Sequence, residues 1–229
     1  MLFFELSFLF ALGSVCGWVI ELFFRRIFSS KRWINPGFLN GPYLPMYGFG
    51  TCILFGFSSI PVPKWLVVII VFFALTLLEY VTGLIFVKVF KIRLWDYSDR
   101  FGNIQGIICP LFSVFWGAIG AGFVYLLYDP LSRLALSAAQ NAWTLYFLGL
   151  FLGVMLVDVF ISFNLSLKIR KAALKFKEAV HYEKLKESIA ERRARLKLKV
   201  NFLFPFRSDR PLKESVEEFL EKFRGKKNQ

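Results

Sequence analysis

Histidine is almost absent from this sequence, and its few cysteines do not pair by spacing. His181 is the sole imidazole, which excludes histidine metal clusters and a Ser/His/Asp triad. Cys16, Cys52 and Cys109 lie in apolar stretches without a C-x-x-C pair, so neither a disulfide framework nor a thiolate metal site is indicated. The G-x-x-x-x-G-K-[ST] run of nucleotide-binding proteins is also missing. We therefore expect no cofactor and no metal, and an ATP-driven role would need a separate ATPase subunit.

Apolar residues and positive charge occupy different parts of the chain. The sequence is 56% hydrophobic yet has a net charge of +13, a combination that few soluble domains show. Residues 1–164 hold ten Lys and Arg against seven Asp and Glu, whereas residues 165–229 hold 19 against nine. The composition predicts a transmembrane bundle over 1–164 and a basic cytoplasmic helical tail over 165–229.

Five apolar segments approach the length of about 20 residues that a helix needs to cross a bilayer. We therefore predict an all-α polytopic membrane bundle of about five transmembrane helices. The second segment is the shortest, and the prolines and glycines before it leave open a re-entrant path instead of a full crossing. The five segments are Leu2–Phe24, Leu44–Ile60, Trp65–Phe90, Ile104–Tyr128 and Asn141–Phe163.

Basic residues alternate between the predicted loops. The first and third loops contain several Lys and Arg residues. The second loop contains one, Lys64, and the fourth contains one, Arg133. Cytoplasmic loops of membrane proteins carry the excess of Lys and Arg. The N-terminus is therefore expected outside and the C-terminus in the cytoplasm. The basic residues of the first and third loops are Arg25, Arg26, Lys31, Arg32, Lys91, Arg93 and Arg100.

The tail is expected to form two helices. Residues 167–200 are predicted to form a helix that continues from the last span. A second tail helix is predicted after it and carries an apolar stripe. Basic charge beside a membrane favours anionic lipids as the first partner and a protein as the second. Nucleic acid is not expected, because no base-stacking aromatics accompany the charge. The stripe residues are Leu212, Val216, Phe219, Leu220 and Phe223.

Three carboxylates lie within predicted spans, where ionisable groups are costly and mark functional sites by default. Glu21 is followed four residues later by Arg25, so the two can form an ordinary helical ion pair beside a packing seam. Glu79 lies well inside its span, and Asp158 lies near the cytosolic end of its own. For each, a structural hydrogen bond or interfacial solvation is the competing interpretation.

Two loops combine amides, aromatics and turn-forming residues. The first runs from Asn35 through Asn40 to Tyr47, and its composition suits a fixed, close-packed loop. The second contains Trp95-Asp96-Tyr97-Ser98, whose aromatics suit the headgroup level, while Asp96 can accept hydrogen bonds from a ligand.

Four sets of residues carry a family resemblance. They are Gly17-Trp18-x-x-Glu21, the loop 35–48, Glu79 with Trp95-Asp96-Tyr97-Ser98, and Asn103-x-x-Gly106-x-x-Cys109. Over residues 10–120 the chain resembles a bacterial integral membrane family classed as ABC transporter permeases of type IV, CmpB-like. It departs from the family at Ile107, where Arg is frequent. The resemblance implies a multi-pass protein of the bacterial inner membrane and a permease-like transport component.

Three functions remain open at this point. We expect a transport component with a cytoplasm-facing polar pocket and no known substrate, with homo-oligomerisation as a further option. The alternatives are a membrane-embedded enzyme acting on lipid or lipid-linked substrates, or a membrane scaffold or regulator. Enzymatic activity stays undecided, and a non-enzyme is favoured. We predict that Glu21, Glu79, Asp96 and Asp158 converge on one polar pocket that opens to the cytoplasm. The full set of candidate pocket residues is Glu21, Arg25, Asn35, Asn40, Tyr47, Glu79, Trp95, Asp96, Tyr97, Asn103 and Asp158.

Overall fold

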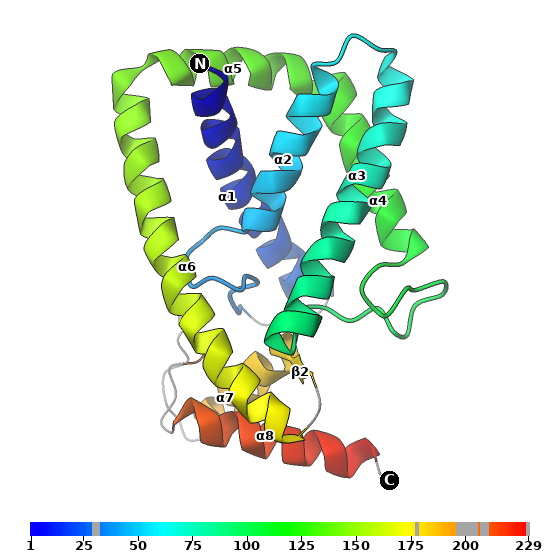
Figure 1. The fold of residues 1–229 in the computed structure, drawn as a ribbon, viewed down its shortest axis with the longest axis vertical. Helices are drawn as coiled ribbons and strands as arrows, with labels where there is room; N and C mark the ends of the chain where they lie inside the picture. Colours follow the sequence, from blue (N-terminus) through cyan, green and yellow to red (C-terminus); the bar gives the residue numbers. More distant parts are fainter. Residues whose placement is uncertain (29–32, 177–178, 196–205, 207–210, 228–229) are drawn as a thin grey trace. The chain divides into compact units, whose positions relative to one another are not determined.

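The computed structural model describes residues 1–28, 33–176, 179–195, 206 and 211–227. Its regular elements are helices apart from two short strands (Figure 1). The strands β1 (Ile92–Arg93) and β2 (Val180–His181) pair in parallel. The helices are α1 (Leu2–Phe28), α2 (Pro45–Ser58), α3 (Lys64–Ile85), α4 (Pro110–Gly122), α5 (Tyr128–Gln140), α6 (Ala142–Phe176), α7 (Tyr182–Arg195) and α8 (Leu212–Lys227), with π-helical turns η1 (Phe86–Phe90) and η2 (Phe123–Leu127).

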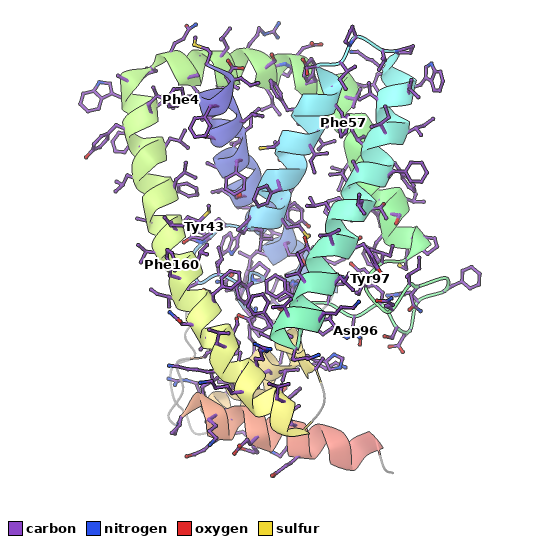
Figure 2. The ribbon with its side chains drawn as sticks, in the orientation of Figure 1. Phe4, Tyr43, Phe57, Asp96, Tyr97 and Phe160 are labelled. Carbon is purple, nitrogen blue, oxygen red and sulfur yellow. The ribbon has the colours of Figure 1, made fainter. Side chains whose placement is uncertain are left out.

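Four helices among the described residues are long and apolar enough to cross a membrane. They cover Leu2–Ile27, Lys64–Phe90, Pro110–Gln140 and Ala142–Lys171. Large apolar side chains extend outward from them, such as Phe160, which is 65% exposed (Figure 2). The predicted all-α membrane class is therefore confirmed. Helix α2 has 14 residues and spans roughly 21 Å, less than a hydrocarbon core of about 30 Å, so the five-helix count stays a prediction.

The predicted start of the fourth segment at Ile104 is wrong, because the helix begins at Pro110. Gln105 and Gly106 have positive φ angles of 56° and 67°, which no helix accommodates. Pro110 lacks an N–H and fits the first helical position. The helical run then continues through η2 and α5.

The prediction of one tail helix over 167–200 is also wrong. Helix α6 ends at Phe176, and α7 begins at Tyr182 after strand β2. Val180 and Ile92 face each other in the β1–β2 pair and are both fully buried. Pairing with a sequence-distant strand therefore overrides the local helical pattern here. Residues 196–200 lie outside the described part of the chain.

The chain packs as two compact units. The first unit comprises Met1–Ile20, Tyr43–Thr82 and Tyr97–Val157. The second comprises Glu21–Pro42, Gly83–Asp96 and Asp158–Gln229. This division concerns packing, whereas the expected division into 1–164 and 165–229 concerns composition and stays a prediction.

Close approach of α1 and α2 organises the first unit. A side chain at Gly13 or Gly17 would overlap Thr51 or Tyr47, and one at Gly48 would overlap α1. The glycines therefore let α2 lie directly against α1, as small residues do in membrane helices. Helix α5 runs across the ends of α1 and α2 (Figure 1). The core of this unit consists of Leu9, Leu54, Phe55, Val67, Val71, Leu75, Phe123, Val124 and Ala135.

Helices α6, α7 and α8 supply most of the core of the second unit. Val216 and Leu220 on α8 are buried against Leu185 and Ile189 on α7. Another helix of the protein therefore covers these two residues of the apolar stripe. The side chain of Phe223 lies outside the described part.

Candidate functional site

Glu79 is the buried carboxylate of the first unit. It lies within α3 and is 3% exposed. One carboxylate oxygen accepts a hydrogen bond from the Tyr97 hydroxyl, and the other accepts one from Trp116 Nε1, both at 3.1 Å. Both donors are neutral. No Lys or Arg pairs with Glu79 anywhere in the part of the chain that the structure describes.

The loop before α4 positions Tyr97. The Tyr97 ring stacks on Phe112 of α4, with centroids 4.5 Å apart, and its backbone N–H donates to the Gly106 carbonyl. Asn103 closes this loop, because its side chain donates to the carbonyls of Ser98 and Arg100 and accepts from Gly106 N–H. Asn103 thus acts on the site through the loop.

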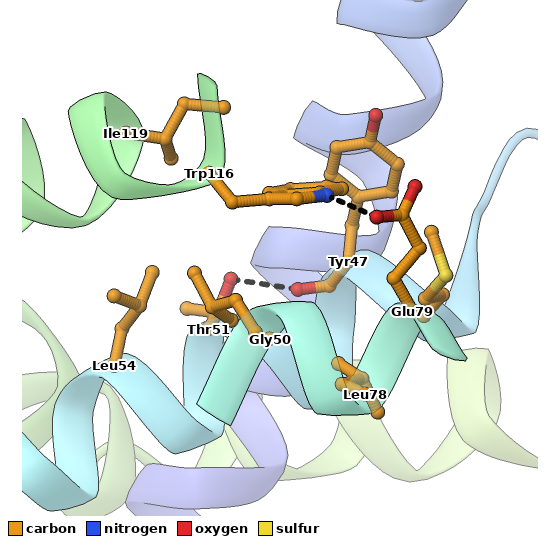
Figure 3. Close-up of a pocket in the computed structure, with 10 residues that line it drawn as sticks. Tyr47, Gly50, Thr51, Leu54, Leu78, Glu79, Trp116 and Ile119 are labelled. Carbon is orange, nitrogen blue, oxygen red and sulfur yellow. Dashed lines mark hydrogen bonds between the residues drawn. The ribbon is translucent and has the colours of Figure 1, made fainter. Parts of the chain in front are cut away.

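A cavity of about 60 Å³ lies beside Glu79. Figure 3 shows the Trp116 ring edge-on, with its face above Thr51 and Gly50. The ring centroids of Tyr47 and Trp116 are 5.5 Å apart. Thr51 Oγ1 donates a hydrogen bond to the Tyr47 carbonyl. The lining comprises Met46, Tyr47, Gly50, Thr51, Leu54, Leu75, Leu78, Glu79, Trp116 and Ile119.

Four charged residues of the second unit form one network. Arg25 Nε lies 2.8 Å from Glu21 Oε1, which confirms the predicted helical pair. The same guanidinium also contacts Glu183 on α7. Glu183 in turn lies 3.0 Å from Lys186 Nζ. Two carboxylates and two cations therefore neutralise each other across α1 and α7.

Lys186 fastens the loop 33–42 to α7. Its ammonium donates to the carbonyls of Asn35 and Gly37 at 2.8 and 3.1 Å, and its side chain is completely buried. With Glu183 this gives three acceptors for three N–H groups. Burial lowers the pKa of Lys186, while the adjacent Glu183 raises it in part. Nearby Tyr182 donates to the Phe38 carbonyl, and burial raises its pKa well above the usual value.

Side chains within and below the same loop complete its hydrogen bonds. Asn35, 1% exposed, donates to the Leu39 and Asn40 carbonyls and accepts from Gly37 N–H. Asp158 on α6 accepts from the backbone and side chain of Asn40, from Gly41 N–H and from Ser162. The expectation of a fixed, close-packed loop is confirmed.

Asp96 pairs with residues of both strands. It lies 3.1 Å from Arg93 and 3.6 Å from His181 Nδ1. Neighbouring Trp95 is half-buried. This group therefore ties the β1 segment to β2 in the second unit.

The structure assembles the candidate residues into separate groups. Tyr47 and Glu79 line the cavity in the first unit, and Tyr97 donates a hydrogen bond to Glu79. In the second unit Glu21 joins Arg25, and Asn40 joins Asp158. Convergence of the four predicted carboxylates on one pocket stays a prediction. Sequence reasoning missed Thr51, Trp116, Glu183 and Lys186, of which only the last two carry a signal, the i,i+3 spacing of opposite charges.

The cavity offers one carboxylate and aromatic surface in otherwise apolar surroundings. Such a site can hold a proton or a small cation, because each carboxylate oxygen has acceptor capacity beyond its single hydrogen bond. It offers no pair of carboxylates for acid/base chemistry within its described lining.

Comparison with known proteins places the chain in a family. Residues 8–163 match the CmpB family model, described as "Putative ABC-transporter type IV". No curated protein and no solved structure matches the chain. The matched region contains the four membrane-spanning candidates almost entirely, the loop 33–42 and the Glu79 cavity. The protein therefore belongs to this CmpB family and is a membrane protein. The match fits a membrane transport component and suggests a separate ATPase subunit as a partner.

Proposed function

We propose that the protein is a permease-like component of a bacterial inner-membrane transporter and that the Glu79 cavity holds its ligand. The observation that supports this is the uncompensated carboxylate, which is 3% exposed beside a cavity of about 60 Å³. A carboxylate in a membrane span costs several kcal/mol, so an unpaired one is retained for function.

The other candidate functions have weaker support. A membrane-embedded enzyme using Glu79 as an acid or base would call for a second carboxylate on the same cleft. Glu79 is the only carboxylate in the described lining. A transport site calls for one charge and a cavity, and both are present.

The proposed arrangement places the C-terminus and the basic tail in the cytoplasm, with α2 as a short fifth membrane segment. The alternation of basic loops supports it. Anionic lipids and further copies of the chain are proposed partners. Reporter fusions at Gln229 and within α5 should report opposite sides of the membrane. A cytoplasmic signal from both positions would contradict the arrangement.

Copurification tests the transport proposal. The full-length chain, extracted from its host membrane in mild detergent, should retain a separate ATP-hydrolysing subunit, and reconstitution should couple ATP hydrolysis to this chain. Glu79→Gln should impair this coupling while membrane insertion persists. Absence of any ATPase subunit, together with unchanged behaviour of Glu79→Gln, would contradict the proposal.

A further inference from the structure

The Glu79 carboxylate has acceptor capacity left for a ligand. An ionised carboxylate offers about four acceptor positions, and Tyr97 and Trp116 occupy two of them. Because both donors are neutral, they orient the charge without cancelling it. The remaining positions can accept hydrogen bonds from the N–H groups of a cation. Such a cation would compensate a buried negative charge that is otherwise costly.

Aromatic surface lines the same cavity. The face of Trp116 lies over the space above Thr51 and Gly50 (Figure 3). The Tyr47 ring is tilted against Trp116 at 59° and also lines the cavity. Aromatic faces attract cations through their negative centre, and tryptophan does so most strongly. Aromatic faces are a recognised binding surface for ammonium groups.

The rest of the lining disfavours a metal ion and an anion. Ca²⁺ needs six to eight oxygen ligands and Mg²⁺ prefers six, but the side chains of the described lining offer oxygens only from Glu79, Thr51 and the Tyr47 hydroxyl. Most other lining residues are Leu, Ile and Met. An anion would meet Glu79 without a compensating cation. An alkylammonium group matches both the charge and the apolar walls.

Size narrows the ligand further. A cavity of about 60 Å³ is several times the roughly 10–15 Å³ that one water molecule needs. It can therefore hold an ammonium nitrogen with a few carbon atoms. A larger amine could place only its head group here.

We propose that the cavity binds the ammonium head group of a small organic amine, with Glu79 as the counter-ion and Trp116 as the aromatic surface. The assignment of this amine as the transported ligand rests on the proposed function. Binding itself does not depend on transport, so the two can be tested separately.

Calorimetry on the full-length protein in detergent tests binding directly. Methylammonium chloride is the probe, with sodium chloride at equal ionic strength and sodium acetate as references. We expect methylammonium chloride to give a saturable heat of binding, and sodium chloride and sodium acetate to give none. No saturable heat with methylammonium, or equal heat with sodium chloride, would overturn the proposal.

Substitutions test the assigned roles. Glu79→Gln should weaken methylammonium binding by roughly ten- to hundred-fold, since a charged hydrogen bond is lost. Trp116→Phe and Trp116→Leu both remove the Nε1 donor, but only Phe retains a ring. The Trp116→Phe variant should bind methylammonium roughly three- to thirty-fold more tightly than the Trp116→Leu variant. Equal binding by wild type and Glu79→Gln would overturn the assignment of the counter-ion.

A matched glycine pair tests the location. A methyl group at Gly50 would meet Leu75 and Leu78 at 3.5 and 3.9 Å, which are ordinary contacts, so Gly50→Ala should fold while narrowing the cavity. At Gly56, also on α2, no described atom outside the nearby backbone of α2 lies within 4 Å of the added methyl group. Gly50→Ala should weaken binding and Gly56→Ala should not, with thermal unfolding confirming that both are folded. Equal affinities would place the ligand elsewhere and overturn the proposal.

Transport is measured separately in proteoliposomes. Methylammonium binding without coupled ATP hydrolysis or flux would contradict the proposed function and leave this inference standing. Coupled hydrolysis in a protein that does not bind methylammonium would overturn this inference alone.

Discussion

The Arg25–Glu183–Lys186 network of the second unit and Glu79 of the first unit differ in how their charge is compensated. In the second unit Glu183 contacts both Arg25 and Lys186, so each charge has a partner of opposite sign. In the first unit Glu79 meets only neutral donors and a cavity. We call a network closed when each charge in it contacts a charge of opposite sign, and such a network fixes a conformation. We call the Glu79 charge open, because it contacts no cation of the described chain and is available to a ligand. The contrast separates residues that maintain the fold from a residue that serves a ligand, although all are ionisable groups with low exposure.

Removing a member of the closed network should have the largest effect on stability. Lys186→Met leaves the carbonyls of Asn35 and Gly37 without their donor and takes from Glu183 one of its two cationic partners. Each buried acceptor left unsatisfied costs about 1–3 kcal/mol. Thermal unfolding in detergent should show a clear loss, and limited proteolysis should cut within the loop 33–42. Lys213→Met, at an exposed position of α8, is the control and should change stability by less than about 0.5 kcal/mol. Equal stability of the two variants would contradict the network.

The helix seam that positions Tyr47 should give an intermediate effect. Gly17→Ala places a methyl group within 3.0 Å of the Tyr47 ring, and overpacking of this kind costs about 1–3 kcal/mol. Methylammonium binding should weaken as well, because Tyr47 lines the cavity.

Gly153→Ala is the matched control, since no described atom lies within 4 Å of the added methyl group. Alanine is a better helix former than glycine by about 1 kcal/mol, so this control should be neutral or slightly stabilised. If both variants gain stability, the seam does not constrain the first unit.

Neutralising the open charge should have the smallest effect on stability. Glu79→Gln loses one acceptor but also removes an uncompensated buried charge, so the free energy of unfolding should change by less than about 1 kcal/mol. Glu183→Gln, the same substitution in the closed network, should cost more, because it weakens contacts with Arg25 and Lys186. Unfolding curves of the two variants sharpen the comparison. A larger loss for Glu79→Gln would indicate that Glu79 is structural.

The sequence predicts what depends on local patterns. Apolar length predicts the membrane helices, and four-residue spacing predicts the Glu21–Arg25 pair, observed at 2.8 Å. Glycines at 13 and 17 predict a packing seam, which α2 fills. The signal for each of these features lies within one continuous segment of the chain.

Features that depend on distant partners escape this reasoning. Trp116 looks like any aromatic of an apolar span until α3 places Glu79 against its Nε1. Lys186 is one of many tail lysines until Asn35, 151 residues earlier, provides its acceptor. Val180 interrupts a helical pattern because Ile92 pairs with it. Which lysine is buried, and which helix breaks, is decided by tertiary contacts.

The attachment of the loop 33–42 to Lys186 also sets an order of events during biosynthesis. Ribosomes add about 5–20 residues per second, so the 151 residues between Asn35 and Lys186 take roughly 8 to 30 s to make. Throughout that interval the carbonyls of Asn35 and Gly37 lack the ammonium that later holds them. The loop is therefore among the first parts of the chain to be made and among the last to be completed. A nascent chain that ends before α7 contains every membrane-spanning candidate yet cannot close this loop.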